Sequence, residues 1–302
     1  MPSVQIRTVA FLGTGLMGLP MVHRLLGAGI QVHAWNRTSE KLQGLGEVGA
    51  RIAPTPAAAC ENADAVCMCL ASVAAAETIL FGTDGVASSR AQPRLLVDFS
   101  TIGVEATLDF AQRMQQRRGS AWVDAPVSGG VPGATQGKLV IFCGGETADI
   151  ARLRLVFEAL AQRVTHAGAV GAGQTMKLCN QLIVSSNLIA IAEAITLARA
   201  GGIDANLLPQ AFAGGFADSI PLQVFGGRMA GGISTPMLGA IALMLKDAGA
   251  IADLAAAHDQ KLPLAATTFS VYQKAAAEGL ANLDLSALMS LYPQGVRHET
   301  AE

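Results

Sequence analysis

A lysine and two amides are the residues of this sequence whose types and spacing most directly suggest chemistry. Lys177 is followed three and four positions later by Asn180 and Gln181, inside a long apolar segment that predicts a helix. Residues at this spacing share one helix face, so the three side chains are expected to converge on one patch. A cation beside two amides is suited to an oxyanion or a hydroxyl group. An exposed lysine beside two packing amides is the plainer alternative, which the residues alone leave open.

A glycine-rich turn near the start of the chain is the second candidate site. Residues 9–12 predict a buried strand that runs directly into a Gly-x-Gly-x-x-Gly segment and then a helix. In this context the glycines permit a tight turn, close approach of a dinucleotide pyrophosphate and close helix packing. The helix N-terminus adds a positive dipole end. We therefore expect cofactor contacts from Gly13, Thr14, Gly15, Leu16, Met17 and Gly18. Glycines that serve only a tight turn are the alternative.

The segment after the second predicted strand indicates whether a dinucleotide bound at the glycine turn would be NAD(H) or NADP(H). Residues 31–35 are followed by Asn36, Arg37 and Thr38, where an NAD-selective site usually carries an acidic residue for the ribose hydroxyls. Arg37 can instead pair with a 2′-phosphate and stack on adenine. We therefore expect these three residues to contact the cofactor, with NADP(H) preferred and NAD(H) possible. An ordinary surface charge at Arg37 is the alternative.

Hydrophobic periodicity sets these candidate sites in a two-domain chain. Up to about residue 165, short apolar runs alternate with helical segments, which is typical of a parallel sheet covered on both faces. After Gly173 only helical patterns follow. We expect an α/β fold with a Rossmann-type, doubly wound, mostly parallel sheet in residues 1–172. An all-α domain should follow in residues 173–302, joined by a long interdomain helix at 174–200.

The individual elements can be placed from apolar runs and from the Gly, Pro, Ser and Asp signals between them. Ser100 and Thr101 are expected to mark the start of the helix at 103–118. The predicted strands are 9–12, 31–35, 65–70, 95–99, 121–124, 139–143 and 164–167. Other predicted helices are 16–28, 205–212, 220–230, 236–257, 263–278 and 285–291.

Composition limits the classes of partner. The 302 residues are 51% hydrophobic and 15% charged with a net charge of -2, so the chain should fold compactly and bind neither nucleic acid nor an anionic membrane. Five scattered cysteines form no disulfide framework, which favours a reducing cytoplasm. Cys67 and Cys69 alternate along a strand and are expected to pack in the core, and we predict no metal site. The apolar stretch at 182–198 predicts a buried helix with dimer contacts.

Five motifs in this order resemble the β-hydroxyacid dehydrogenase family. They are Gly13 to Gly18, Ser100-Thr101, Asp124-Ala-Pro-Val-Ser-Gly-Gly130, Gly171-Ala-Gly-Gln-Thr-Met-Lys177-Leu-Cys-Asn180-Gln181, and Lys246-Asp247. The family includes 3-hydroxyisobutyrate dehydrogenases, tartronate semialdehyde reductases and glyoxylate/succinic semialdehyde reductases. The resemblance implies that Ser128, Gly129 and Gly130 bind the substrate carboxylate, with Asn180 and Gln181 as further substrate contacts. It also implies that Lys177 is the catalytic acid/base and that Thr101 and Lys246 contact the cofactor.

The resemblance implies hydride transfer between a nicotinamide and a small semialdehyde or 3-hydroxy acid in a homodimer or homotetramer. It also implies that the all-α domain in residues 173–302 serves substrate binding and dimerisation. Many family members carry Asn where this chain has Gln181, which makes the substrate contact there uncertain. An Asn-Gln pair is similar to tartronate semialdehyde reductases, whereas Asn36-Arg37-Thr38 is similar to the NADPH-using glyoxylate/succinic semialdehyde reductases. For Lys246 beside Asp247, a surface ion pair is the alternative. An imine reductase, against which Lys177 argues, and a catalytically silent nucleotide-binding protein are the competing functions.

Overall fold

The computed structural model describes residues 5–91 and 95–292, and the chain divides into two compact units after Lys177. Helix α8, Ala172–Ala200, contains this division: its first six residues belong to the first unit and the remainder to the second. Each unit has a hydrophobic core of its own, and the two are described separately below.

The first unit is built on one nine-stranded sheet, whose strand order is β3-β2-β1-β4-β5-β6-β8-β7, with β9 paired to β8. The strands from β3 to β6 along this order are parallel, as expected for a Rossmann-type fold. The predicted fold class is thereby confirmed. The strands are β1 (Thr8–Leu12), β2 (Gln31–Trp35), β3 (Arg51–Ile52), β4 (Ala65–Met68), β5 (Leu95–Asp98), β6 (Ala121–Asp124), β7 (Val127–Ser128), β8 (Leu139–Gly144) and β9 (Ala161–Gly168).

Two strand pairings depart from a simple parallel sheet. Strand β8 runs antiparallel to both β6 and β7, and only its pairing with β9 is parallel. The two-residue strands β3 and β7 were not predicted, because a pair of residues gives no detectable alternation. Strand β7 carries Ser128, one of the residues predicted to bind the substrate.

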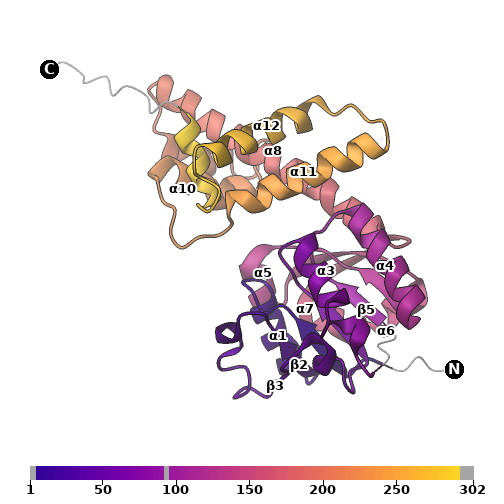
Figure 1. The fold of residues 1–302 in the computed structure, drawn as a ribbon. Helices are drawn as coiled ribbons and strands as arrows, with labels where there is room; N and C mark the ends of the chain where they lie inside the picture. Colours follow the sequence, from indigo (N-terminus) through magenta and orange to yellow (C-terminus); the bar gives the residue numbers. More distant parts are fainter. Residues whose placement is uncertain (1–4, 92–94, 293–302) are drawn as a thin grey trace. The chain divides into compact units, whose positions relative to one another are not determined.

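Helices cover both faces of the sheet, and successive residues of each strand divide between two cores. Val9 and Phe11 of β1 lie in the core beneath α1 (Gly18–Gly27) and α7 (Arg154–Leu160). Ala10 and Leu12 lie in the other core, beneath α3 (Val73–Phe81) and α4 (Val104–Arg118). This alternation is what a strand buried on both faces requires. Figure 1 shows these helices around the sheet; the remaining short ones are η1 (Ser39–Leu42), α2 (Pro56–Ala59), η2 (Val86–Ser88), α5 (Gly130–Gln136) and α6 (Thr147–Arg152).

Helices are the regular elements of the second unit, whose described residues contain no strand beyond a single bridge between Ala240 and Asp284. Beyond α8 it contains η3 (Ala205–Leu207), α9 (Leu208–Phe212), α10 (Ile220–Gly231), α11 (Ile241–Ala257), α12 (Pro263–Ala277) and η4 (Leu285–Leu291). Its core packs Leu188 and Ile195 of α8 against Ile241, Tyr272 and Leu288 from later elements. The predicted helices at 205–212 and 285–291 are partly or wholly of the tighter 3-10 type.

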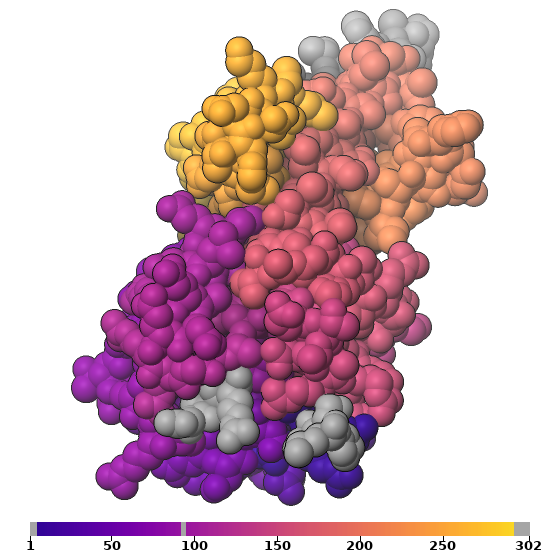
Figure 2. All heavy atoms as spheres, turned by 90° about the vertical axis from the view of Figure 1, so that its right-hand side faces the viewer, coloured from indigo at the N-terminus to yellow at the C-terminus, as the bar shows by residue number. Residues whose placement is uncertain are grey.

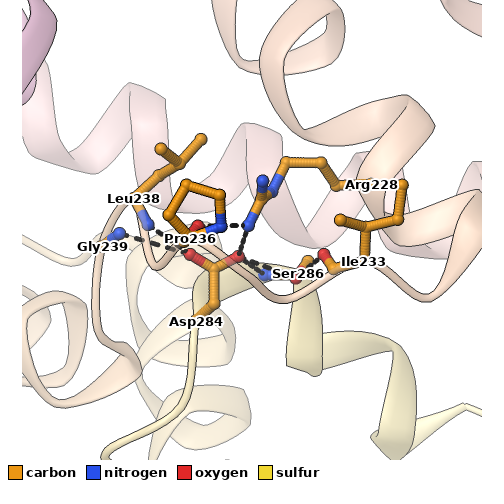
Figure 3. A network of polar contacts seen from close by, with 7 residues as sticks. All are labelled: Arg228, Ile233, Pro236, Leu238, Gly239, Asp284 and Ser286. Atoms are coloured by element: carbon orange, nitrogen blue, oxygen red, sulfur yellow. Dashed lines mark hydrogen bonds and ion pairs between the residues drawn. The ribbon is translucent and has the colours of Figure 1, made fainter.

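The helix predicted at 236–257 begins at Ile241, five residues later than expected. A buried carboxylate accounts for the difference, because Asp284 accepts backbone N–H groups of Leu238 and Gly239 at 2.7 and 3.4 Å and holds this segment as a loop. Figure 3 shows Asp284 at the centre of a polar network that also includes Arg228 at 3.3 Å and the Ser286 hydroxyl at 2.7 Å. Burial alone would raise the pKa of Asp284, but these hydrogen bonds outweigh it and hold the pKa below its usual range.

Helix α8 is long and apolar enough, by length and composition, to cross a membrane, and among the described residues it alone meets that test. A core helix of a compact unit meets the same test. Its polar residues favour the core interpretation, since Gln174, Gln181 and Ser185 are all buried and hydrogen bonded within the protein.

Candidate active site

The glycine turn after β1 has the shape that a dinucleotide needs. A side chain on Gly18 would overlap the carbonyl oxygen of Gly13, so α1 can pack this closely only with glycine there. No atom lies within 4 Å of the position that a side chain on Gly15 would take, so that stretch of backbone is open on this side. Leu16 is 70% exposed beside it. The turn therefore lies between a strand and a helix, with open backbone at Gly15, which is the arrangement that the pyrophosphate prediction requires.

Two of the predicted cofactor residues brace this turn. The side-chain oxygen of Asn36 accepts the Thr14 N–H at 3.0 Å, and its amide nitrogen donates to the Thr38 carbonyl at 2.9 Å. The Thr14 hydroxyl donates to the Lys41 carbonyl at 3.0 Å. Asn36 thus ties the end of β2 to the glycine turn, which the sequence could not show. Arg37 and Thr38 are exposed immediately beyond it, where a guanidinium can reach a ligand from solvent.

The first turn of α8 is clamped by the buried carboxylate of Asp124, the last residue of β6. Asp124 accepts the backbone N–H groups of Gly171 at 2.7 Å and Gln174 at 2.8 Å, so it stabilises the positive end of the helix. Burial raises the pKa of this carboxyl group above its usual value, although the hydrogen bonds oppose the shift. Lys177 lies one turn further along α8, three residues after Gln174.

The side chain of Gln174 provides a second connection between α8 and the sheet. Its amide nitrogen donates to the Ser100 carbonyl at 2.8 Å, and its oxygen accepts the N–H groups of Ile102 and Gly103, each at 3.3 Å. Helix α4 therefore does not begin at a Ser100 or Thr101 cap as predicted; its N-cap is Gly103. The Ser100 hydroxyl instead accepts the Leu70 N–H at 2.8 Å. Thr101, the predicted cofactor contact, is half-buried in this loop.

Lys177 and Ser128 both lie within a few residues, along the chain, of groups in the Asp124 hydrogen bonds. Lys177 is only 7% exposed, which contradicts the alternative of a surface lysine. Ser128 comes four residues after Asp124, on β7, opposite Val140 of β8. Gly129 and Gly130 follow with φ values of 122° and 60°, which favour glycine, and both are exposed at the start of α5. Their backbone is uncrowded, as an anion-binding loop requires.

In the second unit the predicted polar residues form a continuous chain of contacts. The Asn180 amide nitrogen donates to the Gln181 side-chain oxygen at 2.9 Å. The Gln181 amide nitrogen donates to Asp247 on α11 at 2.6 Å, and Lys246 pairs with the other oxygen of Asp247 at 3.2 Å. The alternative of a surface ion pair fits only in part, since Asp247 is 5% exposed. Sequence reasoning gave Asp247, Asp124 and Gln174 no functional role.

Cys67 is buried in the core as expected and Cys69 is half-buried, whereas Cys179 is exposed. Burial raises the pKa of Cys67 to about 12, so its sulfur remains a protonated thiol. Among the residues that the structure describes, no group of three or more His, Cys, Asp or Glu side chains is placed to hold a metal ion.

Known proteins resemble this chain over nearly its whole length. Residues 8–168 match the NAD binding domain of 6-phosphogluconate dehydrogenase, and residues 171–292 match the NAD-binding domain of NADP-dependent 3-hydroxyisobutyrate dehydrogenase. The 2-hydroxy-3-oxopropionate reductase of Escherichia coli K12 is 35% identical over 97% of this chain and 99% of its own length. The chain belongs to the β-hydroxyacid dehydrogenase family.

Two solved structures extend this comparison. One is the Mycobacterium tuberculosis 3-hydroxyisobutyrate dehydrogenase with L-serine, at 31% identity and a TM-score of 0.83, covering 95% of this chain and 99% of that one. The other is the protein Psf3 in complex with NADP+ and 2-OPP, at 26% identity and a TM-score of 0.85, covering 94% and 99%. The predicted family and enzyme class are confirmed: this protein is an NAD(P)-dependent oxidoreductase.

Proposed function

We propose that this protein is an NADPH-preferring oxidoreductase that acts on a small carboxylate-bearing semialdehyde or 3-hydroxy acid. The candidate substrates are tartronate semialdehyde, glyoxylate, succinic semialdehyde and 3-hydroxyisobutyrate. The observation that carries the proposal is a buried lysine, Lys177, one turn beyond a helix start that Asp124 fixes to the sheet. The names of the relatives support the substrate class.

Lys177 is proposed as the general acid/base. When bound, a nicotinamide supplies or accepts the hydride at its C4 carbon. In reduction, the Lys177 ammonium donates a hydrogen bond to the aldehyde oxygen and then protonates the alkoxide. In oxidation, its neutral amine removes the hydroxyl proton. Its burial excludes much of the water that would otherwise compete for the developing oxyanion.

The substrate carboxylate is proposed to bind at Ser128, Gly129 and Gly130. A hydroxyl and uncrowded glycine N–H groups provide several donors without a side chain in the way. Asn180 and Gln181 are proposed as further substrate-binding residues on the same helix as Lys177.

For the cofactor, we propose that the turn at Gly13 to Gly18 holds the pyrophosphate while Arg37 selects the 2′-phosphate. Asn36 and Thr38 are proposed to contact the cofactor beside Arg37, and Thr101 and Lys246 are proposed as further cofactor contacts. Residues 1–172 would then form the NADP-binding domain and residues 173–302 the domain for substrate binding and dimerisation. The exposed position of Arg37 beside the braced turn supports the preference for NADPH.

A homodimer or homotetramer in the cytoplasm is proposed as the assembled form. The part of α8 that belongs to the second unit carries exposed apolar side chains, including Ile183 at 69% and Leu197 at 75% exposure. Figure 2 shows the salmon-coloured segment that contains this part of the chain reaching the surface. A patch of apolar residues on one face is suited to a second copy.

The test is an assay of the four candidate substrates, each in its reactive direction and with both nicotinamides, on the parent and on Lys177→Ala. We expect the variant to lose about 10²- to 10⁴-fold in kcat while keeping its affinity for NADPH, measured by nucleotide fluorescence. Lys274→Ala, at an exposed lysine of α12, is the matched control and should retain parental turnover. Retention of parental kcat by Lys177→Ala would refute the proposed role.

A further inference from the structure

Gln181 makes polar contacts both within its own helix, α8, and to Met244 and Asp247 of α11. Its side-chain oxygen accepts from Asn180 at 2.9 Å, while its amide nitrogen donates to Asp247 at 2.6 Å. Gln181 and Asp247 are each 5% exposed, so this hydrogen bond to a carboxylate is made in a protected environment. Charge-assisted bonds of this kind are short and about twice as strong as neutral ones.

The length of the glutamine side chain is what allows both contacts. An asparagine at this position would be shorter by one methylene group, about 1.5 Å. Withdrawing the amide nitrogen by that amount would stretch the 2.6 Å bond to Asp247 beyond hydrogen-bond range. A longer amide at residue 181 therefore bridges Asn180 and α11.

We propose that Gln181 is a positioning residue, whose amide orients Asn180 toward the substrate and connects it to the Asp247–Lys246 pair that serves the cofactor. This inference rests on the proposed function, and it assigns Gln181 an indirect role within the substrate-binding set. The bond to Gln181 fixes the plane of the Asn180 amide. The opposite oxygen of Asp247 holds the Lys246 ammonium at 3.2 Å.

Moving the negative charge from residue 247 to residue 181 tests whether the bridge, which is the pair of hydrogen bonds from Asn180 to Gln181 and from Gln181 to Asp247, positions Asn180. In Gln181→Glu, two buried carboxylates would face each other across the 2.6 Å contact, which is strongly unfavourable. In the double variant Gln181→Glu/Asp247→Asn, residue 247 donates to residue 181, and Asn180 keeps its acceptor. Every hydrogen bond of the bridge then again has one donor and one acceptor, whereas the Lys246 ion pair is lost.

The readouts are the KM of the aldehyde that the parent reduces fastest, the KM of NADPH, kcat and Tm. We expect Gln181→Glu to raise the aldehyde KM about tenfold or more. The double variant should return that KM to within about threefold of the parent, while the KM of NADPH stays raised. The control is Gln181→Glu/Asp253→Asn, which removes an exposed carboxylate from the same helix and should give no recovery.

Two results would overturn the inference. The first is an aldehyde KM that the double variant does not recover; if Tm recovers without it, Gln181 is a packing residue only. The second is equal recovery with Asp253→Asn. Both require an active parent. A parent that turns over none of the four substrates with either nicotinamide would instead refute the proposed function, so the two failures are distinguishable.

Discussion

Replacing Asp124 by asparagine removes the charge that fixes the start of α8 while keeping the size of the side chain. The carboxylate accepts two N–H groups, from Gly171 and Gln174, at 2.7 and 2.8 Å. The asparagine oxygen can retain one of them as a neutral bond, but its NH2 group would face the other donor. Hydrogen bonds to charged groups contribute about 1.5–3 kcal/mol each, and a buried unsatisfied N–H costs about 1–3 kcal/mol.

The loss is partly offset, because the raised pKa of Asp124 shows that burial already penalises its ionised form. We therefore expect a net loss of about 2 kcal/mol in the free energy of unfolding of the first unit. With an m-value of about 2 kcal/mol per molar, the urea midpoint should fall by about 1 M. Tryptophan fluorescence reports on this unit alone, because the only two tryptophans, Trp35 and Trp122, lie in it.

A functional loss should accompany the change in stability, because Lys177 follows on the next turn of the same helix. Misplacement of a catalytic group by about 1 Å can cost about 100-fold, so we expect kcat to fall tenfold or more. Asp64→Asn is the matched control, since Asp64 also accepts two backbone N–H groups, those of Arg7 and Thr8 at 2.9 Å, but is only half-buried. An Asp124→Asn variant with parental kcat and no greater instability than the control would refute the reasoning.

Three further predictions follow from single positions. Arg37→Ala should raise the KM for NADPH at least tenfold more than that for NADH, and equal effects in steady-state kinetics would exclude Arg37 as the selector. Gly18→Ala should abolish NADPH binding by titration and destabilise the protein by about 1–3 kcal/mol through overlap with Gly13, whereas Gly27→Ala, with open space around it, should be tolerated. Asp284 has a lowered pKa, so the stability that its charge contributes is complete above its unfolded pKa of about 3.9 and is lost as the pH falls through the folded value. The loss of stability in Asp284→Asn, followed by circular dichroism, should therefore shrink below about pH 4. A stability difference between parent and variant that stays constant with pH would contradict this.

The sequence by itself determined the fold class and the positions of most long elements. The run at residues 9–12 is apolar on both faces and ends in glycine, which is enough to specify a buried parallel strand. Helical geometry alone places Lys177, Asn180 and Gln181 on one face of a helix. The glycines of the first turn can be recognised from their spacing in the sequence. These features depend on local periodicity and backbone sterics, both of which are determined by consecutive residues.

Tertiary structure decided which partners the polar residues take. Asp124 and Gly171 are 47 residues apart, Gln181 and Asp247 are 66 apart, and Asp284 ends the loop before α11 from 46 residues away. The antiparallel direction of β8 and the late start of α11 depend on such contacts as well. No pattern in consecutive residues encodes them, because a buried donor or acceptor selects its partner only when folding has brought distant segments together.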